Sequence, residues 1–486
     1  MENNTSHENT NAEGMDIDPN VAAAQIRAMM DAQDSSDHYA RVSEMYIKDT
    51  TRTGYQLQNR TFLAWLFNKN PTCINEYAMQ KLRDIFTAQI GARSLERNKS
   101  VLREAQKIIN SADETKQPIK FTEITVRIFV DFLHSRARGI DTDRNFLSKS
   151  ASGSYRSAFK DLHRQCGVTM NEDFEGKLQT AYKGLQRGHA AEKQSRGGRL
   201  QEGKDPMSYA LYNLVLCKKM LLDGSKEAIF SHAFLTLTWN LICRSMNTVH
   251  IHRNHISWAN DCMTIRFAHT KTDVEGGDQA QICHVFANPY NLAICAVTAV
   301  AKYLGSFVPK PDGMLFDDDS YRRFQKYLSK LLKLHKEEIE LLGGCIEDIG
   351  VHSIRKGAAT YCCGGTTAAP HIAAICNRAG RTMGKVKDTY IQYAEAGDQH
   401  VGRVVAGLPV LNAKYACSPP FFCIDDTEDP KPNTCRTTDV ARSLDVFFPL
   451  LIKDTPSLKP VATYCAAAIC FAYEYFKKVM PTTYVY

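Results

Sequence analysis

Apolar side chains recur every three or four positions through most of this chain, which is the spacing of a helix that buries one face. Between residues 49 and 187 the pattern is helical throughout. Residues 228–242 predict a further, very apolar helix. In contrast, residues 255–258 and 262–267 alternate as strands do, with a turn at 259–261 between them. The sequence therefore predicts a mainly α protein with a small β-sheet, of the α+β class.

Changes in composition along the chain suggest where its domains begin and end. The length of 486 residues allows two or three domains. The first twenty residues carry five acids and no Lys or Arg, which favours a disordered leader. Residues 183–204 hold six Lys or Arg against two Glu, which predicts a flexible basic linker. We predict five parts: a disordered leader (1–48), a helical domain (49–187), a basic linker (188–204), a second domain (205–412) and a C-terminal extension (413–486).

The C-terminal extension ends in a predicted helix, roughly residues 460–479, that is rich in Ala, Tyr and Phe. Two roles are open to it. The helix caps the core of its own chain, or it docks on a neighbouring subunit.

Charge and cysteine content narrow the class of protein. The net charge is +7 and the pI is about 8.6, which is compatible with a nucleic-acid partner. No run of about 18 apolar residues exists, so we expect no membrane span. Sixteen cysteines follow a polar N-terminus without a signal peptide, which favours an intracellular protein with reduced thiols. Cys417, Cys423 and Cys435 lack the spacing of zinc ligands, so we predict no metal site.

His352 and Arg355 lie three residues apart in a predicted helix, so one turn places both side chains on one face. Gly380 and Arg381 follow, and Tyr390 comes nine residues after Arg381. A paired His and Arg can hold a phosphate, and a nearby tyrosine hydroxyl can attack it. The pattern therefore indicates chemistry on a phosphate ester.

The stretch from His352 to Tyr393 resembles the C-terminal half of the active site of tyrosine recombinases, of the phage-integrase or Cre type. That family carries H-x-x-R, then a Gly-His or Gly-Trp pair, then the nucleophilic Tyr nine residues later. Residues 378–382, RAGRT, are similar to the RAGWT form, with Arg381 where His or Trp is usual. Residues 396–409 resemble the segment after the nucleophile in eukaryotic Crypton-like recombinases of mobile elements.

The resemblance extends upstream. The family's first catalytic Arg follows an apolar helix as R-x-x-E, shortly before a β-hairpin, and Arg244 stands at that place with Asn247 instead of the acid. The family's catalytic Lys often lies in a T-K-T run of the hairpin region, which matches Lys271 within residues 270–272. Alone, Arg244 would be interpreted as a helix-end arginine and Lys271 as a loop lysine. Their order and their separation of 27 residues favour the catalytic interpretation.

The resemblance implies six active-site residues, namely Arg244, Lys271, His352, Arg355, Arg381 and Tyr390. Arg244 and Arg355 would bind the phosphate, Tyr390 would form a 3′-phosphotyrosyl bond, and Lys271 would protonate the leaving 5′ oxygen. His352 would add a donor or handle the tyrosine proton. No cofactor and no metal are implied, because the phosphotyrosyl bond conserves the energy of the phosphodiester.

A site-specific recombinase or integrase acts on double-stranded DNA. The resemblance implies that residues 49–187 form a core-binding, SAM-like domain that clamps DNA. By charge alone, the basic residues there also fit an ordinary solvated surface. The resemblance further implies a homo-oligomer, from dimer to tetramer on DNA, and a location in the nucleus.

Two departures from the family pattern keep other functions open. Arg381 and Asn247 fit a catalytically impaired, recombinase-derived protein that only binds DNA. A type IB topoisomerase shares the Arg, Lys and Tyr chemistry. Tyr393 is a rival nucleophile by proximity alone. Tyr361 is expected to pack within the helix of His352. Cys362 and Cys363 are expected to be core thiols.

Overall fold

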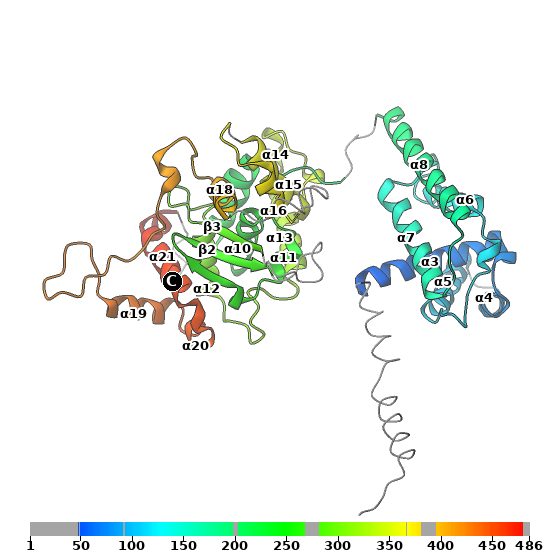
Figure 1. The fold of residues 1–486 in the computed structure, drawn as a ribbon, viewed down its shortest axis with the longest axis horizontal. Helices are drawn as coiled ribbons and strands as arrows, with labels where there is room; N and C mark the ends of the chain where they lie inside the picture. The colour runs from blue at the N-terminus through cyan, green and yellow to red at the C-terminus, as the bar shows by residue number, and fades with distance from the viewer. Residues whose placement is uncertain are drawn as a thin grey trace, which may run out of the picture. The chain divides into compact units, whose positions relative to one another are not determined.

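A computed structural model describes residues 47, 49–90, 93–197, 203–267, 281–365, 367–380 and 395–479. The predicted leader, residues 1–48, falls almost wholly outside these residues. The chain divides into two compact units, Met1–Glu202 and Gly203–Tyr486. Helices dominate both units, and the described strands form one small sheet in the second, so the predicted α+β class is confirmed (Figure 1).

The first unit is a helical bundle around an aromatic core. Phe62 is central to it, because its ring centroid lies 5.6 Å from that of Phe129, 4.9 Å from Phe132 and 5.6 Å from Phe159. Its described helices are α3 (Asp49–Lys69), α4 (Glu76–Ala88), α5 (Ser94–Asn110), α6 (Val126–Arg138), α7 (Lys149–Gln165) and α8 (Glu172–Ser195).

The prediction of a flexible linker over residues 188–204 is wrong for residues 188–195, because helix α8 continues through them to Ser195. Two contacts hold this last part. The Glu192 carboxylate accepts a hydrogen bond of 2.9 Å from the backbone N–H of Asn145, and Gly188 packs against the ring of Phe146. Gly188 and Lys193, which contributed to the prediction of flexibility, are therefore part of a packed helix.

The second unit is built around α10 (Lys226–Asn240), whose residues from Ala228 to Asn240 are all buried. Helices α12, α13 and α15 pack directly on it. The other helices of this unit are α9 (Lys218–Asp223), α11 (Ser245–Val249), α12 (Ala296–Ser306), α13 (Ser320–Leu334), α14 (Lys336–Leu341), α15 (Val351–Gly364), α16 (Ile372–Arg378), α18 (Glu395–Val405), α19 (Thr437–Phe447), α20 (Leu451–Asp454) and α21 (Lys459–Val479). A π-helical segment, Leu211–Cys217, precedes α9.

Within the described residues, the sheet has three antiparallel strands in the order β1 (Ile256–Ala259), β2 (Cys262–Phe267) and β3 (Gln281–Phe286). The turn between β1 and β2 is the predicted one, and Asn260 there has a φ of 54°, which asparagine tolerates better than most residues. Strand β3 was not predicted. It pairs Thr264 of β2 with His284, and α18 packs on it.

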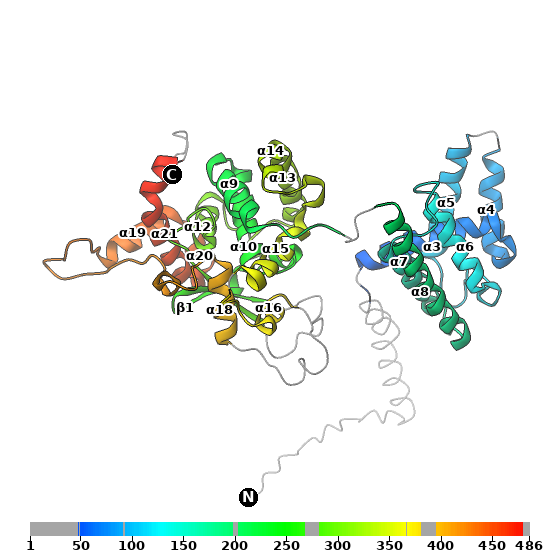
Figure 2. The same cartoon turned by 90° about the horizontal axis from the view of Figure 1, so that it is seen from above.

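The C-terminal helix α21 caps the core of its own chain. It packs on α12 and β1 (Figure 2). The Tyr464 ring stacks on Trp258 with centroids 3.9 Å apart. The part of the extension that the structure describes is thus continuous with the second unit. None of the described helices is long and apolar enough to cross a membrane.

Candidate active site

Arg244 stands in the turn between α10 and α11. The chain leaves α10 through Ile242, whose φ is 49°, and Arg244 then becomes the N-cap residue of α11. The hydroxyl of Thr248 ties this turn down, because it lies 2.9 Å from the Thr238 hydroxyl and 3.2 Å from the Cys243 sulfur. The Arg244 side chain is half-buried, and among the described residues its guanidinium has no hydrogen-bond or ion-pair partner. A fixed backbone thus presents a guanidinium that can accept an outside anion.

Helix α15 carries His352 and Arg355, as predicted. The Gly350 N–H donates a hydrogen bond of 3.0 Å to the Ser353 hydroxyl, which helps to fix the start of the helix. His352 is exposed, whereas Arg355 is half-buried and donates a hydrogen bond from Nη2 to the carbonyl oxygen of Ala379. The H-x-x-R helix is therefore linked directly to the segment that leads to Arg381.

The fold brings the turn of Arg244 and the helix of Arg355 together, since α10 packs on α15. The charge of Arg355 also affects the pKa of Cys243, the residue that precedes Arg244. Burial raises the pKa of Cys243 to about 11, against a hydrogen bond with Thr248 and the charges of Arg355 and Arg378, which lower it. Arg355 and Arg378 therefore lie near the thiol of the residue that directly precedes Arg244.

The other three predicted catalytic residues, Lys271, Arg381 and Tyr390, lie outside the described residues, as does Tyr393. The elements that come before and after them in the chain are nevertheless described. Lys271 belongs to the connection between the paired strands β2 and β3, and Arg381 and Tyr390 belong to the connection between α16 and α18. Both connections begin and end on the second unit.

A buried ion pair joins the two ends of the connection that contains Tyr390. The Arg378 guanidinium, at the end of α16, lies 2.7 Å from Oδ2 of Asp398 in α18, and neither side chain is more than 4% exposed. The same oxygen accepts hydrogen bonds from His284, from the backbone N–H at 2.9 Å and from ring Nδ1 at 2.8 Å. We call Arg378, Asp398 and His284 the buried clasp.

The clasp also reaches α10. Arg378 donates from Nε to the carbonyl oxygen of Asn240 at 3.0 Å and from Nη2 to the carbonyl oxygen of His284 at 2.7 Å. Burial alone would raise the pKa of Asp398, but the charge of Arg378 and the hydrogen bonds from His284 outweigh it and lower that pKa. The carboxyl group is therefore held as the carboxylate.

The sequence interpretation gave the clasp no role. A signal existed at Asp398, because this acid shares a helical stripe with the apolar Val401 and Val405, and a carboxylate on a buried face needs a partner. Its partners could not be chosen from the sequence. Arg378 is 20 positions away and His284 is 114 positions away.

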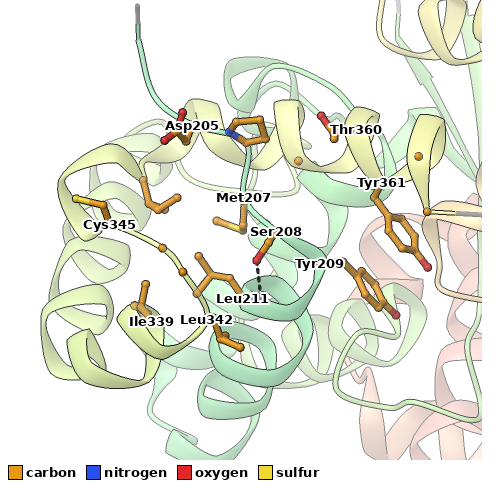
Figure 3. A pocket seen from close by; sticks show the side chains of 17 residues that line it. Asp205, Met207, Ser208, Tyr209, Leu211, Ile339, Leu342, Cys345, Thr360 and Tyr361 are labelled. Atoms are coloured by element: carbon orange, nitrogen blue, oxygen red, sulfur yellow. Dashed lines mark hydrogen bonds between the residues drawn. The ribbon is translucent and has the colours of Figure 1, made fainter. Parts of the chain in front are cut away.

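Figure 3 shows a hollow on a different face of α15. Gly357, Thr360 and Tyr361 of α15 contribute to its lining, and neither His352 nor Arg355 does. At about 100° per residue, Gly357 and Tyr361 lie roughly opposite His352 around the helix. The hollow is therefore separate from the candidate active site.

Of the side chains predicted to be packed in the helix of His352, some are packed and one is not. Tyr361 does pack, since its ring stacks on Tyr209 with centroids 4.2 Å apart. Cys362 is buried, as expected of a core thiol. The same prediction for Cys363 is wrong, because the helix turns its side chain outward and leaves it exposed.

Comparisons with known proteins find likeness of structure only. No protein-family model matches the chain, and no curated protein matches it. Among solved structures, the chain is similar to an FLP recombinase–Holliday junction complex, with 11% identity over 65% of this chain and 78% of the other and a TM-score of 0.36. It is also similar to XerH site-specific recombinase bound to difH substrate in a pre-cleavage complex, with 15% identity over 71% and 95% and a TM-score of 0.34. These values are too low to assign residue roles.

The described ranges hold no group of three or more His, Cys, Asp or Glu side chains arranged to bind a metal ion.

Proposed function

We propose that this chain cuts and rejoins DNA strands by the chemistry of tyrosine recombinases. The observation that carries the proposal is the hydrogen bond from Arg355 to the carbonyl oxygen of Ala379. It joins the H-x-x-R helix to the residue that stands two positions before Arg381 and eleven before Tyr390. The packing of α10 on α15 adds the turn of Arg244 to the same region.

The proposed reaction is a transfer of one phosphoryl group in two steps. The Tyr390 oxygen attacks the phosphorus, a P–O bond to tyrosine forms, and the bond to the 5′ oxygen breaks. The tyrosine proton passes to His352, and Lys271 gives a proton to the 5′ oxygen. Arg244 and Arg355 bind the non-bridging oxygens, where negative charge grows in the transition state. Attack by another 5′ hydroxyl then reverses these bond changes on a new strand.

The first unit is proposed to hold DNA through its basic surface. Lys149 at the start of α7 and Lys183 and Arg187 of α8 line one shallow hollow, together with His189. The lysines and Arg187 are exposed. Charges placed this way gain free energy on DNA by releasing condensed counterions.

The finer parts of the proposal rest on the sequence resemblance. The segment 396–409 supports a Crypton-like recombinase carried by a mobile element. Such a protein would work in the nucleus and assemble on DNA as a dimer to tetramer. The FLP and XerH structures are themselves complexes with a Holliday junction and with difH substrate, respectively.

The first prediction concerns the nucleophile. Duplexes that the wild-type protein binds are selected from a pool with a randomised centre, and each is nicked so that a short 5′-hydroxyl fragment diffuses away after cleavage. We expect wild-type protein to form a covalent DNA adduct that survives denaturing electrophoresis. Tyr390→Phe should form none while retaining the wild-type dissociation constant for the intact duplex, because only the attacking oxygen is removed.

Tyr393→Phe is the matched control and should leave adduct formation at the wild-type rate. An adduct with Tyr390→Phe would show that another residue is the nucleophile. Binding without any wild-type adduct would favour the catalytically impaired, DNA-binding alternative. Relaxation of supercoiled plasmid without exchange between two sites would favour a type IB topoisomerase.

A further inference from the structure

The buried clasp connects the chain segments that carry the predicted catalytic residues. Asn240 ends α10, four residues before Arg244, and its carbonyl oxygen accepts from Arg378. His284 lies on β3, directly after the connection that contains Lys271. Arg378 and Asp398 flank the connection that contains Arg381 and Tyr390. Four segments that are far apart in the sequence thus meet at one guanidinium and one carboxylate.

The clasp is directly adjacent in the chain to the hydrogen bond between Arg355 and Ala379. Arg355 donates from Nη2 to the carbonyl oxygen of Ala379, the residue that follows Arg378. Arg378 is held by ion pairing to Asp398 and by hydrogen bonds to the carbonyl oxygens of Asn240 and His284. A displacement of Arg378 therefore moves the acceptor that orients Arg355.

Close packing leaves little room for the clasp to adjust. Helix α18 lies so near β3 that a Cβ on Gly402 would be 2.3 Å from the carbonyl oxygen of His284. The Arg378 side chain is fully buried, so water cannot substitute for the Asp398 carboxylate without opening the core. Removal of one partner here leaves an uncompensated buried charge.

We propose that Arg378, Asp398 and His284 are positioning residues for DNA cleavage, which set the location of Arg355 and hold together the two described ends, Arg378 and Asp398, of the connection that contains Arg381 and Tyr390. None of the three touches the DNA in this assignment. The inference rests on the proposed function, and it adds an ion pair whose geometry, beyond its contribution to folding, determines the rate of the chemical step.

The test separates positioning from stability. Asp398→Asn removes the charge but keeps the shape and one acceptor oxygen, and it leaves Arg378 unpaired. The double variant Arg378→Gln with Asp398→Asn removes both charges, so that no buried charge lacks a partner, although glutamine is too short to bond all four oxygens that Arg378 contacts. We measure the melting temperature, the dissociation constant for the selected duplex and the single-turnover rate of adduct formation at saturating protein.

We expect Asp398→Asn to lower both the melting temperature and the rate, the rate by about 100-fold, as a misplaced catalytic group does. The double variant should recover part of the melting temperature, because no buried charge is left without a partner, but it should not recover the rate. Both variants should bind the duplex with the wild-type dissociation constant. Asp454→Asn is the matched control, because it breaks another ion pair of a buried arginine, Arg253 at 2.6 Å, on elements that carry none of the six predicted catalytic residues. It should lower the melting temperature alone.

Each other outcome has a definite meaning. A rate that returns together with the melting temperature in the double variant, or a wild-type rate in Asp398→Asn, would overturn the positioning role and leave the proposed function standing. If neither variant folds at the assay temperature, the clasp is a folding requirement only and the inference is wrong. If wild-type protein forms no adduct on any selected duplex, the proposed function is wrong, and this inference, which rests on it, is wrong as well.

Discussion

Arg244 and Arg355 show how the fold treats two side chains of the same chemistry in different ways. Arg355 is anchored by its hydrogen bond to Ala379, so its direction is set before any ligand arrives. Arg244 stands on a rigid turn, and its guanidinium has no partner among the described residues. One arginine is therefore pre-oriented by protein, and the other is available to be oriented by a phosphate.

A residue in the first unit gives a prediction about acid stability. Burial between the rings of Phe121 and Phe159 lowers the pKa of His163 to about 4, from an ordinary value of 6.5. Above pH 6.5 the ring is neutral in both the folded and the unfolded chain. Between pH 6.5 and 4 only the unfolded chain gains the proton, so the free energy of unfolding falls as the pH is lowered. This shift corresponds to a loss of about 3 kcal/mol by pH 4.

His163→Phe keeps the aromatic contacts and removes the titration. We expect the variant to match the wild type at pH 7 and to exceed it in melting temperature at pH 4.5. Calorimetry of the full chain at the two pH values measures the difference. An equal loss of stability on acidification in both proteins would show that the fold does not suppress protonation of His163.

At the scale of elements, α15 is placed by the chain that crosses it. The backbone N–H of Met207 donates to the carbonyl oxygen of Ser353 at 2.9 Å, and Met207 passes close over Gly357. A Cβ on Gly357 would lie 2.0 Å from the Met207 carbonyl oxygen, a distance that no side chain can occupy. The helix that carries His352 and Arg355 is therefore seated through a glycine on another of its faces.

Two glycines of α15 make a matched pair of substitutions. Gly357→Ala should lower the free energy of unfolding by about 1–3 kcal/mol, because backbone must move to admit the methyl group. Gly364→Ala, where nothing lies within 4 Å of the added carbon, should leave it unchanged or raise it by up to about 1 kcal/mol through helix propensity. Urea denaturation of both variants gives the comparison. Equal effects at the two positions would contradict this account of how α15 is seated.

At the scale of the whole molecule, the two compact units divide the work that we propose. The first unit offers exposed basic side chains on α7 and α8, and the second holds the described candidate catalytic residues. The formal net charge of +7 on 486 residues is modest. Binding strength should therefore depend on where the positive charges lie more than on their total.

This placement predicts a salt dependence. The double variant Lys183→Ala with Arg187→Ala should weaken DNA binding at low salt and reduce the slope of log K against log salt by about one for each phosphate that is no longer neutralised. Lys177→Ala on the same helix is the control, because Lys177 is already paired with Asp173 at 2.6 Å. Fluorescence anisotropy at several salt concentrations measures the slopes. Unchanged slopes in the double variant would place the DNA on another surface.

Local patterns in the sequence determined the helices, the β1–β2 hairpin and the helix of His352 and Arg355. Apolar periodicity and a turn-forming asparagine act over a few residues, so they can be recognised without the rest of the fold. The same local reasoning failed at residues 188–195, because the contacts of Gly188 and Glu192 come from Phe146 and Asn145, more than 40 positions away.

Only the tertiary structure decided how the candidate site is assembled. Strand β3, the seat of α21 on its own core and the ion pair of Arg378 with Asp398 all join segments that no short pattern relates. A buried charge must find a partner wherever the fold supplies one, and the sequence shows the need without showing the partner. The residues with recognisable chemistry could therefore be named from the sequence, whereas those that position them appeared only when the chain was folded.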